Sequence, residues 1–583
     1  MILSSAPGSG TSPAILEGCL TVIAIAMAFC LPRLGSAWFR GLEQTLRRFA
    51  RRQSLAVAVV GSTAFLLRLA LLPLSPIPQP FTPDDFSFLL SADTFAHGRL
   101  ANPTPAMWTH FESIHITMIP TYASMYFPAH GLVLAAGEAL TGHAWYGLLF
   151  VTALMCAAIC WMLQAWLPPG WALLGGMLAV LRLGLFSYWI NTYTGGASVA
   201  ALGGALVLGA FPRLMRTTRM RYGLLLALGI SMLVTSRPYE GLLLCLPVAV
   251  VLGRWVFAGK NRPAPAALLL RAALPVALIV AVGAWMAYYD YRAFGNPLTP
   301  PYQIDRAQYA VEPYWMWQPP RPEPVYRHKV MRDFYVKAEL PVVINFRTTA
   351  GFVQQNLLKP VTLLRFFAGI ALLPPLIMLR RVLMDRRTRF FVLGGVVLMG
   401  GMFLEIVMLP HYLAPFTAAF YALGLQCMRH LRVWKPEGKS VGMSLVRFLV
   451  LTCFALVPIR AFAEPLHLTL SNWPPSAWTA NWYGPGHLGA PRARVEDNLK
   501  QLPGKQLAIV RYAPDHDPVW EWVYNDADIE NAKVIWAREM DAADNLALIR
   551  YYKDRTVWLV QPDKNPPEIT PYTASKHQTG NTE

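Results

Sequence analysis

A succession of long apolar runs constrains this chain more than any other feature of its sequence. A helix that crosses a bilayer needs about 20 mostly apolar residues, and about twelve runs approach that length. These runs lie near residues 14–32, 54–74, 144–166, 169–187, 195–212, 222–236, 240–258, 267–289, 361–379, 390–409, 411–428 and 443–463. Because lipid cannot hydrogen-bond an open backbone, such spans must be helical. The sequence therefore predicts an all-α polytopic membrane protein.

The composition agrees with a membrane protein and argues against a nucleic-acid-binding protein. Hydrophobic residues make up 55% of the 583 residues and charged residues 14%, whereas soluble proteins carry about a quarter charged residues. The formal net charge is +18, but the basic residues stand in short clusters between apolar runs, as in cytoplasmic loops. No polar segment carries a basic stripe interleaved with aromatic residues. We therefore expect no nucleic acid as a partner.

The seven cysteines indicate neither a disulfide framework nor a metal site. Each of them falls within an apolar run. Cys156 and Cys160 are one helical turn apart, but the surrounding sequence ALMCAAICWML supplies no further ligand. We therefore expect these residues to belong to the core, and we expect neither a structural metal nor a cofactor.

Arginine-rich loops orient the apolar runs, because cytoplasmic loops carry an excess of Lys and Arg. The loops concerned are 33–52, 213–221, 254–271, 380–389 and 429–447. Placing all five in the cytoplasm is compatible with about twelve crossings. Both termini then lie outside the cytoplasm. The N-terminus lacks the basic segment and cleavage site of a secretory signal, so we expect the first run to remain as a membrane anchor.

This threading divides the chain into four parts. They are N-terminal transmembrane helices at 1–74, a first extracytoplasmic loop with amphipathic helices at 75–143, a transmembrane bundle at 144–463 with a large outer loop at 290–360, and an extracytoplasmic α/β domain with a polar tail at 464–583. Within the first loop, residues 129–142 are apolar but too short to cross a bilayer. We predict that they form a helix on the outer membrane surface.

The last part shows the pattern of a small α/β domain. Strand-like runs occur at 506–512, 532–537 and 555–560, and residues 543–552 are typical of a helix between the second and third of them. A polar tail follows after about Pro566, and it need not be ordered.

Two adjacent carboxylates begin a helix in the first outer loop. Thr82 is a natural N-cap, Pro83 fits the first helical position, and Asp84 and Asp85 follow in the first turn. Gly98 can end this helix. Acidic residues in a first turn commonly just complement the helix dipole. At a membrane–water boundary, however, such a pair could also supply a general base for a hydroxyl nucleophile.

Other polar residues are expected at the same outer boundary. The segment HFESIH contributes His110, Glu112 and His115, whose order differs from that of metalloproteases. A polar cluster that shapes a substrate pocket is the favoured interpretation, beside a metal site or plain loop polarity. The threading also places charged residues at the outer ends of spans, namely Arg68, Arg182, Arg237, Glu240 and Glu405.

Arginine at the outer boundary runs against the inside bias and would suit a bound phosphate. The alternative explanation is that the side chain snorkels to the interface or pairs with Glu240, Glu405 or the paired aspartates, and we favour it for Arg68 but not for Arg237. His411 and Tyr412 begin another outer turn. We therefore list Arg237, Glu240, His411 and Tyr412 as candidate substrate-binding residues.

The motifs PDDFSFLLSADTFAHG (83–98), SRPYEG (236–241) and HYLAP (411–415), with a terminal outer domain, resemble the GT-C class of membrane glycosyltransferases. This class includes protein O-mannosyltransferases and the lipid A aminoarabinose transferase. The resemblance implies Asp84 as the catalytic base with Asp85 as its neighbour, although the residues alone do not separate the two roles. The chain departs from the class pattern at Asp85, where Glu is common, and in an additional N-terminal span.

The resemblance also implies a reaction and a location. The donor would be a sugar on a polyprenyl phosphate, the acceptor a lipid, polysaccharide or protein outside the cytoplasm, and the anomeric configuration would be inverted. The protein would lie in a bacterial inner membrane. A transporter or lipid flippase is the main alternative, but it predicts internal repeats and helices interrupted near mid-membrane; the sequence shows no convincing repeat. A non-enzymatic assembly or sensor protein and a phosphoryl-group transferase remain weaker alternatives.

Overall fold

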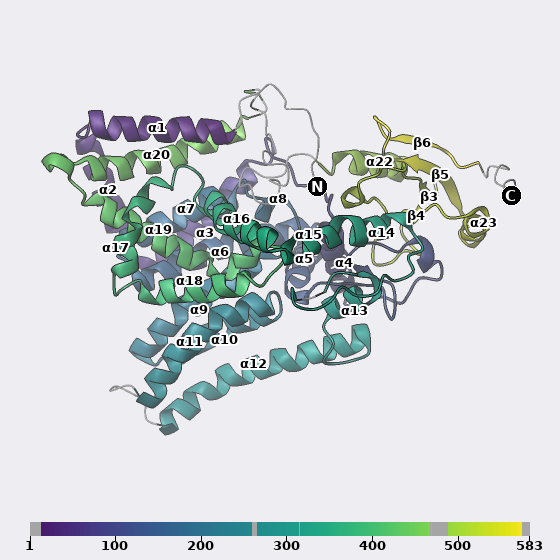
Figure 1. The fold of residues 1–583 in the computed structure, drawn as a ribbon, viewed down its shortest axis with the longest axis horizontal. Coiled ribbons are helices and arrows are strands. Elements are labelled where there is room, and N and C mark those ends of the chain that lie inside the picture. The colour runs from purple at the N-terminus through teal and green to yellow at the C-terminus, as the bar shows by residue number, and fades with distance from the viewer. Residues whose placement is uncertain are drawn as a thin grey trace. The chain divides into compact units, whose positions relative to one another are not determined.

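The computed structural model is predominantly helical and describes residues 13–258, 265–313, 315–463, 465–466, 468 and 488–573 (Figure 1). The chain forms two compact units. The helical unit comprises Met1–Ile77, Trp145–Met286 and Asn345–Gly486. The loop unit comprises Pro78–Ala144, Ala287–Ile344 and His487–Glu583. Each unit is therefore assembled from three separate stretches of the chain.

Among the described residues, six helices are long and apolar enough to cross a membrane. They are α3 (Gln53–Ala70), α6 (Ala144–Trp166), α9 (Ala197–Thr217), α11 (Pro238–Ala258), α12 (Pro265–Phe294) and α20 (Val441–Ala461). Shorter apolar helices are α1 (Pro13–Cys30), α7 (Pro169–Ala179), α10 (Met220–Val234) and α18 (Arg389–Met402). Large apolar side chains remain exposed along the long helices, for example Val250 at 62% and Val280 at 63%. Such exposure suits a lipid environment, and the prediction of a mostly helical membrane protein is confirmed.

Two expected spans take a different form. The helix expected at 361–379 is α16, which runs from Thr349 to Phe367. Thr348 caps it by accepting a hydrogen bond from the Gly351 N–H at 3.0 Å, and Gly369 at φ +59° follows its end. The helix expected at 411–428 is α19 (Thr417–Arg432), preceded by a 3₁₀ turn over Pro410–Phe416. Two prolines in this turn lack the N–H that an α-helix needs, which delays the start of α19.

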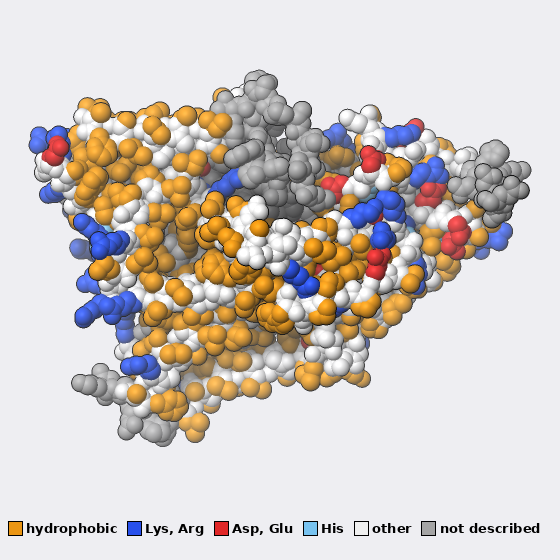
Figure 2. Space-filling model, viewed as in Figure 1, with side chains coloured by type: hydrophobic (Ala, Val, Ile, Leu, Met, Phe, Trp, Pro, Cys, Tyr) orange, Lys and Arg blue, Asp and Glu red, His pale blue; other side chains and the backbone are white. Residues whose placement is uncertain are grey.

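Polar contacts join several of the arginine-rich loops within the helical unit. Glu43 lies on α2 (Ser36–Ala50) and bonds Arg432 at 2.6 Å and Arg447 at 2.8 Å. Arg271 donates to Thr218 at 2.7 Å. Figure 2 shows Lys and Arg side chains gathered near α2 and α17 (Leu379–Met384), while hydrophobic side chains cover much of the visible helical surface. These contacts connect loops that the charge bias places on one side of the membrane.

The loop unit contains short helices and a small hairpin. Its elements before the terminal domain are α4 (Pro83–Ala96), β1 (Ile116–Thr117), β2 (Ala123–Ser124), α5 (Pro128–Thr141), α13 (Pro301–Tyr309), α14 (Lys329–Arg332) and the π-helix η3 (Asp333–Glu339). The helix α15 (Leu340–Arg347) follows η3. The helix predicted at 129–142 is confirmed as α5. The helices within 290–360 were not predicted from the sequence.

The terminal domain is the predicted α/β domain with one additional helix and one additional strand. Its elements are α22 (Ala490–Gln501), β3 (Lys505–Val510), β4 (Val534–Arg538), α23 (Ala542–Tyr551), β5 (Arg555–Gln561) and β6 (Glu568–Pro571). The sheet order is β4-β3-β5-β6, in which β3 is parallel to β4 and β5. The first residues after Pro566 form β6, which pairs antiparallel with β5. Residues 574–583 lie outside the described residues.

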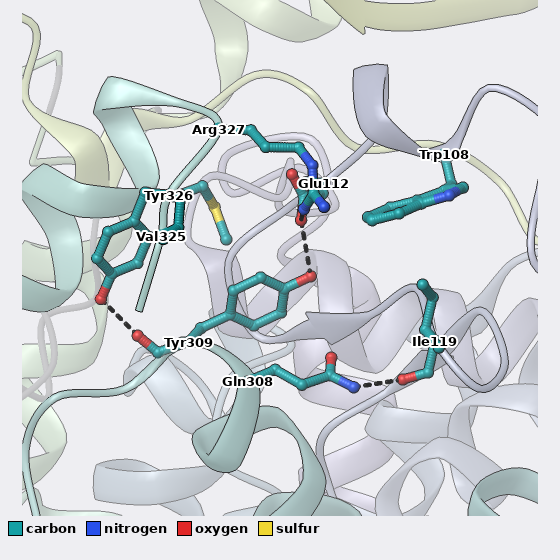
Figure 3. A pocket seen from close by; sticks show the side chains of 9 residues that line it. Trp108, Glu112, Ile119, Gln308, Tyr309, Val325, Tyr326 and Arg327 are labelled. Atoms are coloured by element: carbon teal, nitrogen blue, oxygen red, sulfur yellow. Dashed lines mark hydrogen bonds and ion pairs between the residues drawn. The ribbon is translucent and has the colours of Figure 1, made fainter. Parts of the chain in front are cut away.

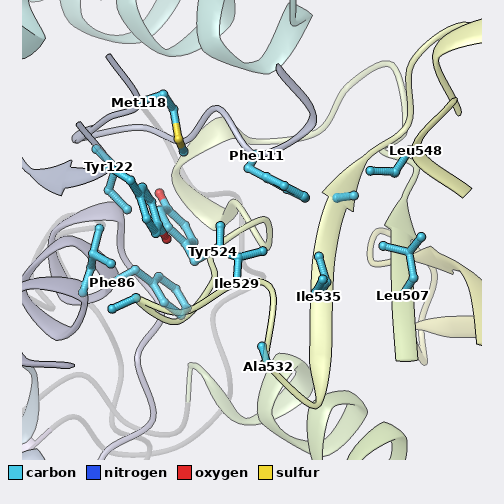
Figure 4. Packing of buried hydrophobic residues seen from close by; sticks show 14 of the residues in the cluster. Phe86, Phe111, Met118, Tyr122, Leu507, Tyr524, Ile529, Ala532, Ile535 and Leu548 are labelled. Carbon is cyan, nitrogen blue, oxygen red and sulfur yellow. The ribbon is translucent and has the colours of Figure 1, made fainter. Parts of the chain in front are cut away.

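Alternate residues of the central strands build two cores, as the two-residue period of a strand requires. Leu507 and Ile535 face one core, which they share with Phe86 of α4 and Phe111 of the first loop (Figure 4). The opposite face of the sheet packs against α22 through residues that include Ala508, Val510, Val495 and Leu499. The acidic helix α4 and the terminal domain therefore share one hydrophobic core.

Candidate active site

Asp84 and Asp85, in the first turn of α4, have different surroundings. Thr82 caps the helix and accepts a hydrogen bond from the Asp85 N–H at 3.3 Å. In return, the Asp85 carboxylate accepts the N–H groups of Phe81 and Thr82, each at 3.2 Å. This is the reciprocal capping box, and Asp85 is fully buried within it. The helix start predicted from the sequence is confirmed, and Asp85 serves to cap it.

Asp84 instead contacts a histidine and a tyrosine from the hairpin. Its Oδ1 lies 2.8 Å from His115 Nδ1 and accepts a hydrogen bond from the Tyr126 hydroxyl at 2.5 Å. The same hydroxyl lies 3.2 Å from His115 Nδ1. The side chain of Asp84 is 23% exposed. Asp84 is thus a fixed carboxylate that solvent can reach.

Local structure explains how these three side chains meet. The strands β1 and β2 pair antiparallel, with Ile116 opposite Ser124, so the hairpin returns the chain beside His115. Phe88 lies one helical turn after Asp84, on the same face of α4. Its ring stacks on that of Tyr126 at 4.3 Å between centroids. Tyr126 was not predicted from the sequence, because no local pattern marks the short hairpin that returns it to Asp84.

His115 has a strained backbone. Its φ is +63°, in the left-handed region that residues other than glycine rarely adopt. Ser87 donates to the His115 carbonyl at 2.7 Å, and the Met125 N–H donates to it at 3.2 Å. Strain of this kind costs about 1–3 kcal/mol and often occurs at functional sites. The surrounding contacts therefore hold the imidazole against an unfavourable backbone conformation.

Three carboxylates affect the pKa of His115. Burial alone would lower the pKa of His115, but its hydrogen bond to Asp84 and the charges of Asp84, Asp305 and Glu339 raise that pKa above its usual value. Burial raises the pKa of Asp305 to about 6 and also raises the pKa of Glu339. Arg306 contacts Glu339 at 3.6 Å. The environment thus favours the imidazolium form of His115 beside a charged Asp84.

The segment 110–115 does not bring its three polar residues to one point. Glu112 is buried against Arg327 at 3.2 Å, the Tyr309 hydroxyl at 3.2 Å and His328 at 3.5 Å. Burial is the main cause that raises the pKa of Glu112. Glu112 lines a pocket of about 280 Å³, in which Tyr309 and Arg327 reach toward its carboxylate (Figure 3). His115 alone joins Asp84.

His110 contacts the terminal domain. Its Nδ1 lies 3.1 Å from the backbone carbonyl of Arg538. Arg538 in turn donates to the carbonyl of Glu112 at 2.7 Å. Across the described parts of the chain, no group of three or more His, Cys, Asp or Glu side chains has the arrangement of a metal site. His110 therefore ties the first loop to the α/β domain.

The helical unit gathers the other candidate residues. Arg237 pairs with Glu240 at 3.1 Å and donates to the Gly195 carbonyl at 3.0 Å. Its guanidinium lies over the ring of Tyr412, 4.5 Å from the centroid. The pairing with Glu240 is the alternative that the sequence left open for Arg237. Three turns that are distant in sequence therefore meet here.

His411 belongs to the same cluster. Its Nδ1 lies 2.8 Å from the Tyr188 hydroxyl, which also accepts the His411 N–H at 3.1 Å. Gly195 has φ +82°, and a Cβ at this position would lie 2.7 Å from the His411 ring. Only glycine therefore fits beside this histidine.

The remaining charged residues of the spans form structural contacts. Arg182 pairs with Glu17 at 3.1 Å, and each side chain is 2% exposed. Arg68 donates to the Ser75 carbonyl and to Asn191, each at 2.9 Å. The oxygens that Arg68 contacts belong to backbone carbonyls and to an amide, and not to the carboxylates considered as its partners from the sequence.

Comparison with known proteins finds similarity at the level of structure. No family model and no curated protein matches the chain. ArnT from Cupriavidus metallidurans in the apo state is 16% identical, with a TM-score of 0.46 over 86% of this chain and 92% of ArnT. ArnT bound to undecaprenyl phosphate is also 16% identical, with a TM-score of 0.45 over 87% and 92%.

The oligosaccharyltransferase from Archaeoglobus fulgidus, tethered with an acceptor peptide, is a further similar structure. It is 11% identical, with a TM-score of 0.45 over 86% of this chain and 68% of that protein.

Proposed function

We propose that this protein is a membrane glycosyltransferase that moves a sugar from a polyprenyl-phosphate donor to an extracytoplasmic acceptor, with Asp84 as the general base. One observation carries the proposal: Tyr126 and His115 hold the carboxylate of Asp84 at 2.5 and 2.8 Å while it stays partly exposed. A catalytic base needs this combination of fixed geometry and access to its substrate.

The contacts of the neighbouring aspartate favour Asp84 for this role. Asp85 is fully buried, and its carboxylate accepts two backbone N–H groups in the capping box. A proton acceptor must come within hydrogen-bond reach of the acceptor hydroxyl. Asp85 could do so only if the start of α4 came apart. We therefore assign Asp85 to the support of Asp84.

The reaction would proceed as a single displacement. The acceptor hydroxyl oxygen forms a bond to the anomeric carbon as its proton passes to Asp84. The bond between that carbon and the phosphate oxygen breaks, polyprenyl phosphate leaves with the electron pair, and the anomeric configuration is inverted. His115 and Tyr126 keep Asp84 oriented throughout.

The departing phosphate is proposed to bind the cluster in the helical unit. A guanidinium offers two parallel donors to phosphate oxygens, and His411 can add a further donor. Arg237 is paired with Glu240, so phosphate would have to compete with that carboxylate for one edge of the guanidinium. The pair would keep Arg237 positioned before the donor arrives.

The proposed arrangement in the membrane follows the charge bias of the loops. It has about twelve spans, a loop unit outside the cytoplasm and both termini on the same side. The polyprenyl tail of the donor would remain in the bilayer. The proposed location is a bacterial inner membrane, with the four parts 1–74, 75–143, 144–463 and 464–583 as divided above.

The test is a donor-consumption assay on the purified protein in liposomes. Polyprenyl phosphates carrying different hexoses or pentoses would be supplied with an extract of envelope acceptors, and released polyprenyl phosphate would be measured by mass spectrometry. We expect release to depend on both protein and acceptor, and we expect a product with inverted anomeric configuration. Movement of intact donor across the bilayer without cleavage would instead support a flippase. Absence of cleavage with every donor would refute the proposal.

A further inference from the structure

The terminal sheet has a topological switch point that the proposed reaction leaves unexplained. The chain leaves the central strand β3 for β4 on one side, and then crosses to β5 on the other side of β3. Where neighbouring parallel strands continue in opposite directions, a crevice opens beyond their carboxyl ends, and ligands commonly bind there. The crevice is therefore expected just after Val510 and Gln561, where β3 and β5 end.

A pocket of about 270 Å³ lies at this position. His516 comes from the segment after β3, and Asp563 follows β5. Phe81 and Trp520 form part of the wall, with their rings stacked at 5.7 Å between centroids. Phe81 also donates its N–H to Asp85. The wall of the pocket thus includes a residue that supports the capping box of α4.

His516 and Asp563 form a dyad inside this pocket. His516 Nδ1 lies 2.6 Å from Asp563 Oδ1, and the Ala513 N–H donates to the other carboxylate oxygen at 2.7 Å. Tyr512 stacks against the imidazole at 3.9 Å between centroids. Carboxylate, backbone and ring together fix the orientation and tautomer of the histidine.

Among the described residues, the other imidazole nitrogen of His516 has no hydrogen-bond partner. The side chain of His516 is 6% exposed, and its Nε2 is buried without a hydrogen bond from any described residue. Buried polar atoms are normally paired, so an orphaned one calls for an explanation. With Nδ1–H donated to Asp563, Nε2 accepts a hydrogen bond in the neutral imidazole and donates one in the imidazolium, and a hydroxyl group can serve either form. A bound ligand that carries an O–H donor would satisfy it.

The charged groups around the pocket argue against a phosphate ligand. Arg492 already donates to Glu496 at 2.7 Å and to two backbone carbonyls at 3.0 Å. Glu521 pairs with Arg538 at 2.6 Å. The segment RYAPDHD after β3 contains no glycine, whereas dinucleotide sites at this position use a glycine-rich turn. What the pocket offers is an aromatic wall and a hydroxyl acceptor, the features that suit a neutral sugar.

We propose that this pocket binds a saccharide through His516 and Trp520, and that the saccharide is part of the acceptor. A sugar hydroxyl would donate to His516 Nε2, and the apolar face of the sugar ring would lie on the indole. The identification as acceptor rests on the proposed transferase function, whereas saccharide binding does not. The terminal domain would then hold the acceptor chain while another of its hydroxyls reacts.

A saccharide array tests the proposal on the full chain in detergent. The fluorescently labelled protein would be applied to an array of bacterial-envelope mono- to pentasaccharides, and affinities for retained structures would be measured by tryptophan quenching. His516→Asn keeps an N–H donor toward Asp563 but removes Nε2. We expect His516→Asn and Trp520→Ala each to weaken binding at least about tenfold, a loss typical of one well-made contact.

Two control variants separate this site from others. His97 is an exposed histidine of the same unit, with a side chain 64% exposed, so His97→Asn should bind like the wild type. Asp84→Asn should also retain binding while losing transfer. Unfolding temperatures of all variants would confirm that each is folded. The proposal is overturned if no saccharide is retained, or if His516→Asn and Trp520→Ala bind like the wild type. Saccharide binding without any donor cleavage would refute only the proposed transferase function.

Discussion

The helical unit and the loop unit treat charged groups in different ways. In the helical unit, Arg182 and Glu17 neutralise each other directly, and both side chains are 2% exposed. In the loop unit, Asp84 is held by Tyr126 and His115 and stays 23% exposed. The first arrangement closes a charge pair inside the protein, and the second leaves a charged group accessible to solvent. Full burial therefore marks Arg182 and Glu17 as structural residues, whereas partial exposure is what the proposed role of Asp84 requires.

The helical unit contains an intermediate case. Arg237 is paired with Glu240, but its side chain is 17% exposed, compared with 2% for Arg182. It also contacts the ring of Tyr412. An ion pair that solvent can reach can exchange its carboxylate for a phosphate at lower cost than a fully buried pair. The comparison therefore separates Arg182, a structural residue, from Arg237, a candidate binding residue.

Breaking the buried ion pair of Arg182 and Glu17 should produce the largest loss of stability. Glu17 also accepts the N–H groups of Ile370 and Ala371, each at 3.1 Å, so it joins α1 to the end of α16. We expect Glu17→Gln to reduce the free energy of unfolding by about 3 kcal/mol, because it leaves Arg182 buried without a counter-charge. Thermal unfolding in a defined detergent would measure the loss. The double variant Glu17→Gln/Arg182→Met should recover part of it; a further loss would contradict the assignment.

Removing the histidine beside Asp84 should lower the rate of transfer far more than it lowers the stability of the fold. We expect His115→Ala to lower kcat about 100-fold, because a misplaced catalytic group costs about that factor. His115→Asn retains a donor near the position of Nδ1 and should recover part of the activity. Equal losses in both variants, or an unchanged rate in His115→Ala, would show that His115 does not position Asp84.

Comparison with the sequence shows which features local patterns can predict. Thr82, Pro83 and Asp85 follow a local capping rule, so the start of α4 could be predicted exactly where it occurs. The strands of the terminal domain have strong local signals as well. Tyr126 reaches Asp84 only because a short hairpin folds back. No period or spacing in the sequence encodes that return.

The segment HFESIH shows more clearly that closeness in sequence does not predict a shared site. His110, Glu112 and His115 are close in sequence, and a shared pocket was a reasonable expectation. In the structure they contact Arg538, Arg327 and Asp84, respectively. Their divergence follows from the positive φ of His115 and from packing against segments hundreds of residues away. Those partners are tertiary features, which a single sequence does not reveal.

The ion pair between His115 and Asp84 predicts that the stability of the protein depends on pH. Its pKa is raised in the folded protein, so its stabilising contribution is complete below the unfolded value of about 6.5 and is lost as the pH rises through the raised value. We therefore expect the wild type to exceed His115→Asn in unfolding temperature at pH 6, with a smaller difference at pH 9. A difference that grows with pH would contradict this assignment.

The smallest effect on stability is expected at Glu43, a partly exposed carboxylate of the helical unit. Burial alone would raise the pKa of Glu43, but Arg432 and Arg447 lower it to about 2. Its contribution is therefore complete above about 4.5 and disappears as the pH falls toward 2. We expect Glu43→Gln to cost about 1 kcal/mol at pH 7, as for other accessible ion pairs. Unfolding at pH 7 and pH 3 would show whether the difference narrows at acid pH.

The most direct test of the central claim compares the two neighbouring aspartates under identical conditions. Transfer from a polyprenyl-phosphate sugar would be measured for Asp84→Asn and Asp85→Asn, with unfolding temperatures as the control for structure. We predict that Asp84→Asn folds normally and loses about 10³-fold in rate, within the range of general base catalysis. Asp85→Asn should lose stability and retain most of the rate per folded molecule. Full transfer by Asp84→Asn, or a larger catalytic loss in Asp85→Asn, would contradict the assignment of Asp84 as the base.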